Sequence, residues 1–114
     1  MFTLTNSELF TVTHQHCYQI GNLLFIHIVF RTNKTVDETG VYTLGQLSLK
    51  PAHTHSFAIV PANPGVTNDM RVDPGYISAD GVISFDITKT YSSKNYTFDI
   101  TTFYCTDITA TAEV

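Results

Sequence analysis

The sequence predicts an all-β fold, an antiparallel β-sandwich or barrel of jelly-roll type with about seven or eight short strands. Three observations favour it. Segments with alternating apolar and polar residues are separated by clusters of Gly, Asn, Asp and Pro, which are turn formers. No segment has the period of a long amphipathic helix. The 114 residues include 8 Phe and 6 Tyr, but only 14% are charged, a composition typical of strands and of buried or shared surfaces.

The N-terminal third predicts a hairpin. A strand from Leu9 to Ile20 is followed by Gly21-Asn22, a two-residue turn signal, and by a second strand from Leu23 to Arg31. The second strand is apolar on both faces, so both need a cover, and a neighbouring subunit is expected to supply one. On the first strand, strict alternation predicts that one face carries Phe10, Val12, His14, His16, Tyr18 and Ile20.

The rest of the chain predicts shorter strands separated by tight turns. Turns are expected at Asp73-Pro74-Gly75 and at Asp80-Gly81. The strands are expected over Val41–Leu49, His55–Val60, Asn68–Asp73, Tyr76–Ser78, Val82–Ile87 and Asn95–Thr106. Residues 1–114 therefore form one domain, in which residues 1–7 are an extended N-terminal segment.

Charge and motifs exclude several classes of function. The net charge is −4 and the six Lys and Arg are scattered, so no basic patch for nucleic acid is expected. No apolar stretch is long enough to insert into a membrane. No nucleophile motif or paired carboxylates stand out, which predicts a protein without enzymatic activity. Cys17 and Cys105 are either free thiols or a disulfide, and only adjacent strands would let them pair.

The order of several segments resembles a known family. Tyr18–Leu24 starts a hairpin, Thr43–Leu47 leads to a loop at Lys50-Pro51, and Tyr76–Ile83 holds a second hairpin before a final aromatic strand. This order is similar to the C-terminal head domains of tail-fibre, baseplate and minor structural proteins of phages and prophages. The resemblance implies a homotrimer in the virion, at the tail tip or fibre, which is assembled in the host cytoplasm. It also implies contacts with other tail or baseplate proteins and attachment to a bacterial cell-surface saccharide.

The expected function is therefore non-catalytic host recognition. The alternatives are a purely structural tail or baseplate component that makes protein–protein contacts, and a cellular carbohydrate-binding module. Aromatic and polar side chains in or near the predicted loops could bind a saccharide, and the candidates are His53, His55, Asp69, Arg71, Tyr76 and Tyr91.

Two His-x-His motifs raise the question of a metal. His14 and His16 project from one face of a predicted strand, and imidazole is a good ligand for Zn, Fe, Ni and Cu. Around the threefold axis that the resemblance implies, three chains could hold one axial transition metal. The alternative is that they are ordinary solvated strand histidines and that the protein has no cofactor. His27, which lies among apolar residues, is interpreted as a packed or interface histidine.

Overall fold

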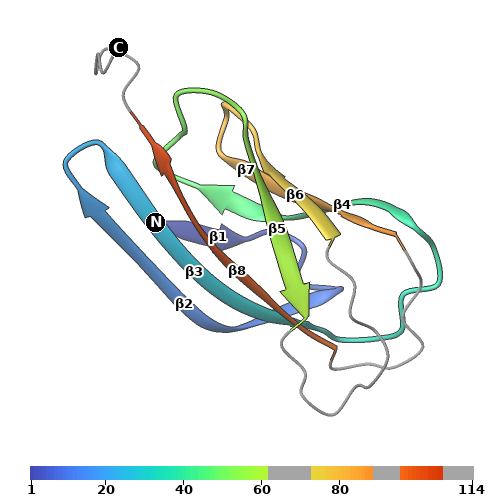
Figure 1. The fold of residues 1–114 in the computed structure, drawn as a ribbon. Coiled ribbons are helices and arrows are strands. Elements are labelled where there is room, and N and C mark those ends of the chain that lie inside the picture. The colour runs from blue at the N-terminus through green and yellow to red at the C-terminus, as the bar shows by residue number, and fades with distance from the viewer. Residues whose placement is uncertain (62–72, 89–95, 107–114) are drawn as a thin grey trace.

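The computed structural model describes residues 1–61, 73–88 and 96–106, and within them the chain is built from eight antiparallel strands (Figure 1). The all-β prediction is confirmed. These parts of the chain contain no helix that could cross a membrane. The strands are β1 (Phe2–Leu4), β2 (Phe10–Ile20), β3 (Leu23–Thr32), β4 (Gly40–Leu47), β5 (His55–Pro61), β6 (Asp73–Ile77), β7 (Val82–Ile87) and β8 (Thr97–Cys105).

The strands form one sheet that curls into a nearly closed barrel (Figure 1). Its order is β1-β4-β7-β6-β5-β8-β3-β2. β5 joins the two halves, because its residues from His55 to Ile59 pair with β6 whereas Val60 and Pro61 pair with β8. The two ends of the sheet also meet, since the Gln15 side chain on β2 donates a hydrogen bond of 3.2 Å to the Phe2 carbonyl on β1.

The core lies inside this curled sheet. Four fully buried rings from both halves, Phe10, Phe30, Phe85 and Phe98, pack with neighbouring centroids 5.2 to 5.9 Å apart. Burying one such side chain stabilises a fold by about 1.5–3 kcal/mol, so these rings fasten β2, β3, β7 and β8 together.

Both predicted glycine turns are present. Gly21 has a φ of 58° and Gly81 a φ of 85°, values that favour glycine. Ile20 pairs directly with Leu23, as a two-residue hairpin requires. The predicted turn at Asp73-Pro74-Gly75 is wrong, because these residues belong to β6 and pair with β5. There the bare Gly75 backbone accommodates the Phe57 ring, which would lie only 2.5 Å from an added Cβ. Residues 68–72 of the expected strand lie outside the described residues.

The N-terminal segment is part of the sheet. Phe2 to Leu4 form β1, which pairs with β4 from Leu47 to Gly45. Phe2 is 6% exposed and belongs to the core. Within the extended segment expected over residues 1–7, Phe2 to Leu4 thus form a paired strand.

The prediction that one face of β2 carries residues 10 to 20 in strict alternation is wrong. A bulge interrupts the strand, because Val12 pairs with Phe30 but His14 already pairs with Val29. The extra residue, Thr13, reverses the alternation, since one inserted residue shifts every later side chain to the other face. Phe10 and Val12 therefore face the core, whereas the exposed residues His14, His16, Tyr18 and Ile20 face outward.

The bulge also determines which way the side chain of Cys17 faces, and therefore whether it can pair with Cys105. Cys17 turns inward and packs against the core, whereas Cys105 pairs with the outward-facing Leu23. Neither is part of a disulfide. β3 lies between β2 and β8, so the two cysteines are on neither adjacent strands nor the same face, and no disulfide forms.

Candidate functional site

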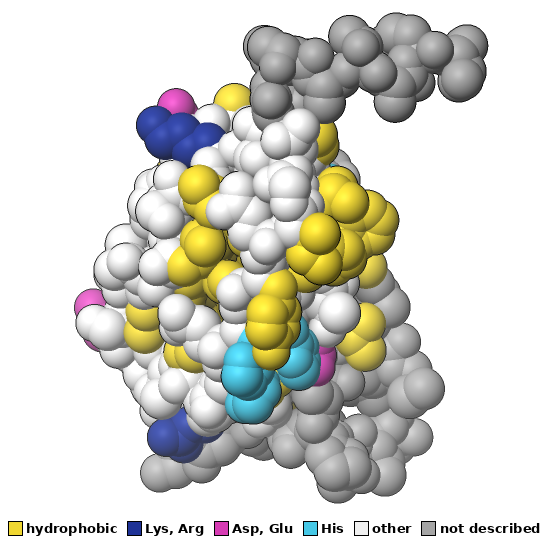
Figure 2. Space-filling view, turned by 90° about the vertical axis from the view of Figure 1, so that its left-hand side faces the viewer, with side chains coloured by type: hydrophobic (Ala, Val, Ile, Leu, Met, Phe, Trp, Pro, Cys, Tyr) yellow, Lys and Arg dark blue, Asp and Glu magenta, His cyan; other side chains and the backbone are white. Residues whose placement is uncertain are grey.

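Three histidines gather on the outer face of β2 and β3, and we call them the histidine cluster: His14, His16 and His27. His16 pairs directly with His27 across the two strands, and His14 is two residues away on β2. The ring centroids of His14 and His16 are 4.4 Å apart, and those of His14 and His27 are 5.3 Å apart. Figure 2 shows these imidazoles as one exposed group beside hydrophobic side chains.

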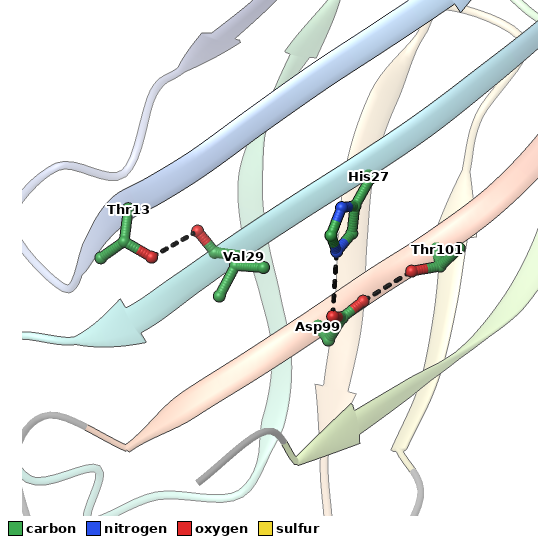
Figure 3. A network of polar contacts seen from close by, with 5 residues as sticks. All are labelled: Thr13, His27, Val29, Asp99 and Thr101. Carbon is green, nitrogen blue, oxygen red and sulfur yellow. Dashed lines mark hydrogen bonds and ion pairs between the residues drawn. The ribbon is translucent and has the colours of Figure 1, made fainter.

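A carboxylate on β8 holds one of the three rings. His27 Nε2 lies 3.0 Å from Asp99 Oδ2, and Thr101 donates a hydrogen bond of 2.6 Å to Asp99 Oδ1 (Figure 3). The His27 and Asp99 side chains remain 39% and 31% exposed, so the contact orients the ring but adds little to stability. With Nε2 facing the carboxylate, Nδ1 is the nitrogen of His27 that is left for another ligand.

The other two histidines are less constrained. His16 Nδ1 lies 3.4 Å from the Tyr18 hydroxyl, and the two rings stack with an interplanar angle of 2°. His14 and His16 are both exposed. As the side chains stand, no group of three His, Cys, Asp or Glu among the described residues is arranged to hold a metal ion.

An apolar surface continues from the cluster towards the β2–β3 turn, and we call it the hairpin patch. It consists of Tyr18, Ile20, Leu23 and Phe25, which are 59%, 69%, 39% and 37% exposed. These residues form two facing pairs, Tyr18 with Phe25 and Ile20 with Leu23. Contiguous exposed apolar surface of this kind marks interaction sites in soluble proteins. The second apolar face predicted for β3 is therefore real and is uncovered in the single chain.

A shallow hollow of about 280 Å³ lies next to the hairpin patch, at the end of β8. It is lined by residues 52–55 and by Phe103, Tyr104 and Cys105. The Phe103 ring is 56% exposed, and its centroid lies 5.5 Å from that of Phe25, so it stands between the hollow and the patch. His55 Nε2 lies 2.8 Å from the Thr102 hydroxyl.

The structure brings together some of the residues that were predicted to bind a saccharide. His53 and His55 line the same hollow. Tyr76 lies elsewhere, on β6, where its hydroxyl donates a hydrogen bond of 3.4 Å to Asp86 Oδ2. The remaining three candidates, Asp69, Arg71 and Tyr91, lie outside the described residues. Phe103 was missed because strand alternation alone does not say which aromatic residues end beside a loop.

Burial shifts the pKa of two side chains in the lining of the hollow, His55 and Tyr104, and of Cys17 on β2. Loss of solvent lowers the pKa of His55 and raises the pKa of Cys17. The same effect, with a smaller contribution from the charge of Cys17, raises the pKa of Tyr104 to about 12. His55 therefore favours its neutral form, in which one ring nitrogen donates and the other accepts a hydrogen bond.

The described surface thus offers two distinct kinds of chemistry. One is the set of imidazoles and the carboxylate on β2, β3 and β8, and the other is an aromatic ring beside imidazole and hydroxyl groups at the hollow. Comparison with protein-family models, curated proteins and solved structures finds no match for this chain.

Proposed function

We propose that the chain is a non-catalytic binding module that holds one ring of a bacterial cell-surface saccharide in the hollow beside Phe103. The observation that carries this proposal is a hollow of about 280 Å³ whose lining includes the exposed residue Phe103 together with His53 and His55. Ligand pockets usually start at about 300 Å³, so the hollow suits one sugar ring and not a larger ligand.

The chemistry of the lining supports a sugar. The apolar C–H face of a pyranose packs on an aromatic ring, while its hydroxyl groups need partners that both donate and accept hydrogen bonds. Phe103 offers the ring, and the imidazoles of His53 and His55 line the same hollow and supply ring nitrogens as hydrogen-bonding groups, with Nε2 of His55 already in contact with the Thr102 hydroxyl. The Thr54 hydroxyl adds a third polar group to the same lining.

The setting that we propose is the tail or baseplate of a phage, and it rests on the order of sequence segments described above. A shallow hollow binds one sugar weakly. Three copies in a homotrimer would present three hollows to a repetitive polysaccharide, and linked sites bind far more tightly than one. The particle would thereby attach to its host through many weak contacts.

A second function, a structural component that makes only protein–protein contacts, is favoured by the hairpin patch. Its apolar side chains are exposed and carry no charge, which suits a permanent interface better than a sugar site. Phe103 borders both surfaces, since its ring contacts that of Phe25, but the other residues differ and their mutation separates the two functions. Phe103 and His53 belong to the hollow, and Ile20 and Leu23 to the patch.

The test is binding of the purified chain to a glycan array and to whole bacterial cells. We expect Phe103→Ala and His53→Ala to reduce binding at least tenfold, because the first removes the ring and the second a polar partner. Val41→Ser is the matched control, since Val41 is a 68% exposed apolar residue on the other half of the sheet. Unchanged glycan and cell binding by Phe103→Ala would contradict the proposal.

A further inference from the structure

We propose that His14, His16 and His27 of a single chain form a binding site for a divalent transition-metal ion of the zinc type. This goes beyond saccharide binding and uses none of the residues of the hollow. It rests on where the strands place the three imidazoles and on the carboxylate that orients one of them.

The backbone places the three side chains at the corners of a small triangle. His14 and His16 are two residues apart on β2, so their Cβ atoms are about 6.5–7 Å apart, twice the rise per residue. His27 is directly opposite His16, and cross-strand Cβ atoms are about 4.5–5.5 Å apart. Imidazole nitrogens bind zinc at about 2.0–2.1 Å, and side chains of this length reach a common point above such a triangle.

Only side-chain rotation separates the observed arrangement from a metal site. The imidazoles do not now converge on one point. His14 and His16 are exposed and His27 is half-buried, so their rings can turn without moving the core. The ring centroid of His14 lies only 4.4 Å from that of His16 and 5.3 Å from that of His27, so the three rings are already close neighbours on the outer face.

Asp99 acts as a positioning residue in this proposal. Metal-binding histidines usually donate their second ring N–H to a carboxylate, which fixes the tautomer and makes the other nitrogen a better ligand. His27 Nε2 makes this contact with Asp99, which leaves Nδ1 for the ion. Thr101 in turn holds the second oxygen of Asp99. An ordinary solvated histidine needs neither partner.

Three protein ligands leave the fourth position of a tetrahedral zinc ion for water or for a group on a partner. The site would also lie beside the hairpin patch, because Tyr18 stacks on His16. A bound ion would thus order the exposed end of β2 next to that patch.

The experiment uses full-length protein without a polyhistidine tag. Co²⁺ is titrated while its visible absorption is recorded, Zn²⁺ is then added as competitor, and equilibrium dialysis gives the number of ions per chain. We expect one ion per chain, a tetrahedral Co²⁺ spectrum and displacement by Zn²⁺. His27→Ala should abolish the spectrum, and Asp99→Ala should weaken binding about 10- to 100-fold.

The matched control is His53→Ala, which removes an exposed imidazole outside the cluster and should bind Co²⁺ as the unchanged chain does. Far-UV circular dichroism without metal establishes that each variant is folded. Absence of Co²⁺ uptake by the folded protein would overturn the proposal. A stoichiometry of one ion per three chains that is the same in His27→Ala would also overturn it. That result would assign the metal to an axial site formed by His14 and His16 of three chains.

Discussion

Tyr104 shows how one buried hydroxyl links the end of β8 to the loop that covers it. Its hydroxyl donates a hydrogen bond of 2.5 Å to the Leu49 carbonyl, and the residue is only 4% exposed. Burial raises its pKa to about 12, above the ordinary value of 10. The folded state therefore holds the proton more tightly than the unfolded state does.

We expect the free energy of unfolding to fall as the pH rises from about 10 towards 12, because the unfolded chain then loses the proton first. Denaturant unfolding between neutral and alkaline pH measures this. Tyr104→Phe should flatten the alkaline part of the profile and cost about 1 kcal/mol at neutral pH, since the Leu49 carbonyl loses its donor. Tyr18→Phe removes an exposed hydroxyl and is the control. An alkaline profile that Tyr104→Phe leaves unchanged would contradict the assignment.

His55 gives a second expectation, with the opposite sign. Burial lowers its pKa below 6.5, so the folded state resists protonation. The stability associated with this residue is present above pH 6.5 and is lost as the pH falls through the lower, folded-state pKa. His55→Gln, which cannot titrate, should unfold with a weaker dependence on pH in this range, as followed by urea unfolding. His53→Ala serves for comparison, and an equal change in both variants would argue against a specific effect of His55.

The histidine cluster could be predicted from the sequence only in part. His14 and His16 were recognised because their spacing alone puts them on one face of a strand. His27 was interpreted as a packed or interface residue because its neighbours are apolar. The sequence nevertheless contains a signal that places it beside His16. The Gly21-Asn22 turn pairs Ile20 with Leu23, and counting back from that pair places His16 opposite His27. Asp99 could not be found this way, because the pairing of β3 with β8 depends on contacts far apart in the chain.

At the level of the strand, the bulge in β2 determines which of its side chains lie on the outer face of the sheet. Before the bulge, the even-numbered residues Phe10 and Val12 face the core. After it, the even-numbered residues from His14 to Ile20 face solvent. The bulge could not be predicted from the sequence, because the polar residues after Val12 are compatible with either face of the sheet. The strand expected over Val82–Ile87 was predicted correctly, and its apolar residues Ile83, Phe85 and Ile87 are buried.

Deleting Thr13 tests the role of the bulge. Without this residue, Val12 and His14 become neighbours opposite Phe30 and Val29, and both parts of the strand keep their present faces. We therefore expect the variant to fold, with a melting temperature within a few degrees of the unchanged chain, since it loses only an exposed 3.3 Å hydrogen bond to the Val29 carbonyl.

The matched variant deletes Gln15 instead. This deletion turns every later residue of β2 to the other face, so His16, Tyr18 and Ile20 would point inward and Cys17 outward. Thermal melting followed by circular dichroism should show a much larger loss of stability than for the Thr13 deletion. Equal melting temperatures for the two variants would mean that the bulge does not determine which side chains of β2 point towards the core.

For the whole molecule, the sequence predicted the class of fold but not how the barrel closes. The order β1-β4-β7-β6-β5-β8-β3-β2 joins strands that are far apart in the chain, such as β1 with β4 and β3 with β8. Local alternation identifies strands, but it carries no signal for which distant strand is the neighbour. The division of β5 between β6 and β8 is therefore a result that only the three-dimensional structure provides.

The last expectation concerns assembly. It rests on the two apolar faces of β3, one of which is uncovered, and on the order of sequence segments, whose resemblance to phage head domains implies three copies. One face fills the core, whereas Leu23 and Phe25 on the other are 39% and 37% exposed beside Tyr18 and Ile20. Water contact with such a surface is unfavourable, so covering it with a second and a third copy stabilises an oligomer. We expect a homotrimer, with a mass by light scattering of about three times the 12.7 kDa of one chain.

The double variant Ile20→Ser with Leu23→Ser removes the most exposed facing pair of the hairpin patch, and we expect it to dissociate the trimer into folded monomers. Val41→Ser is the control, since Val41 is equally apolar and exposed but lies on β4. Dissociation should lower binding to cells, because it removes multivalency. Binding of a single saccharide should stay unchanged, because the variant keeps Phe103. A monomeric unchanged chain at micromolar concentration would contradict the trimer and leave the patch for a different partner.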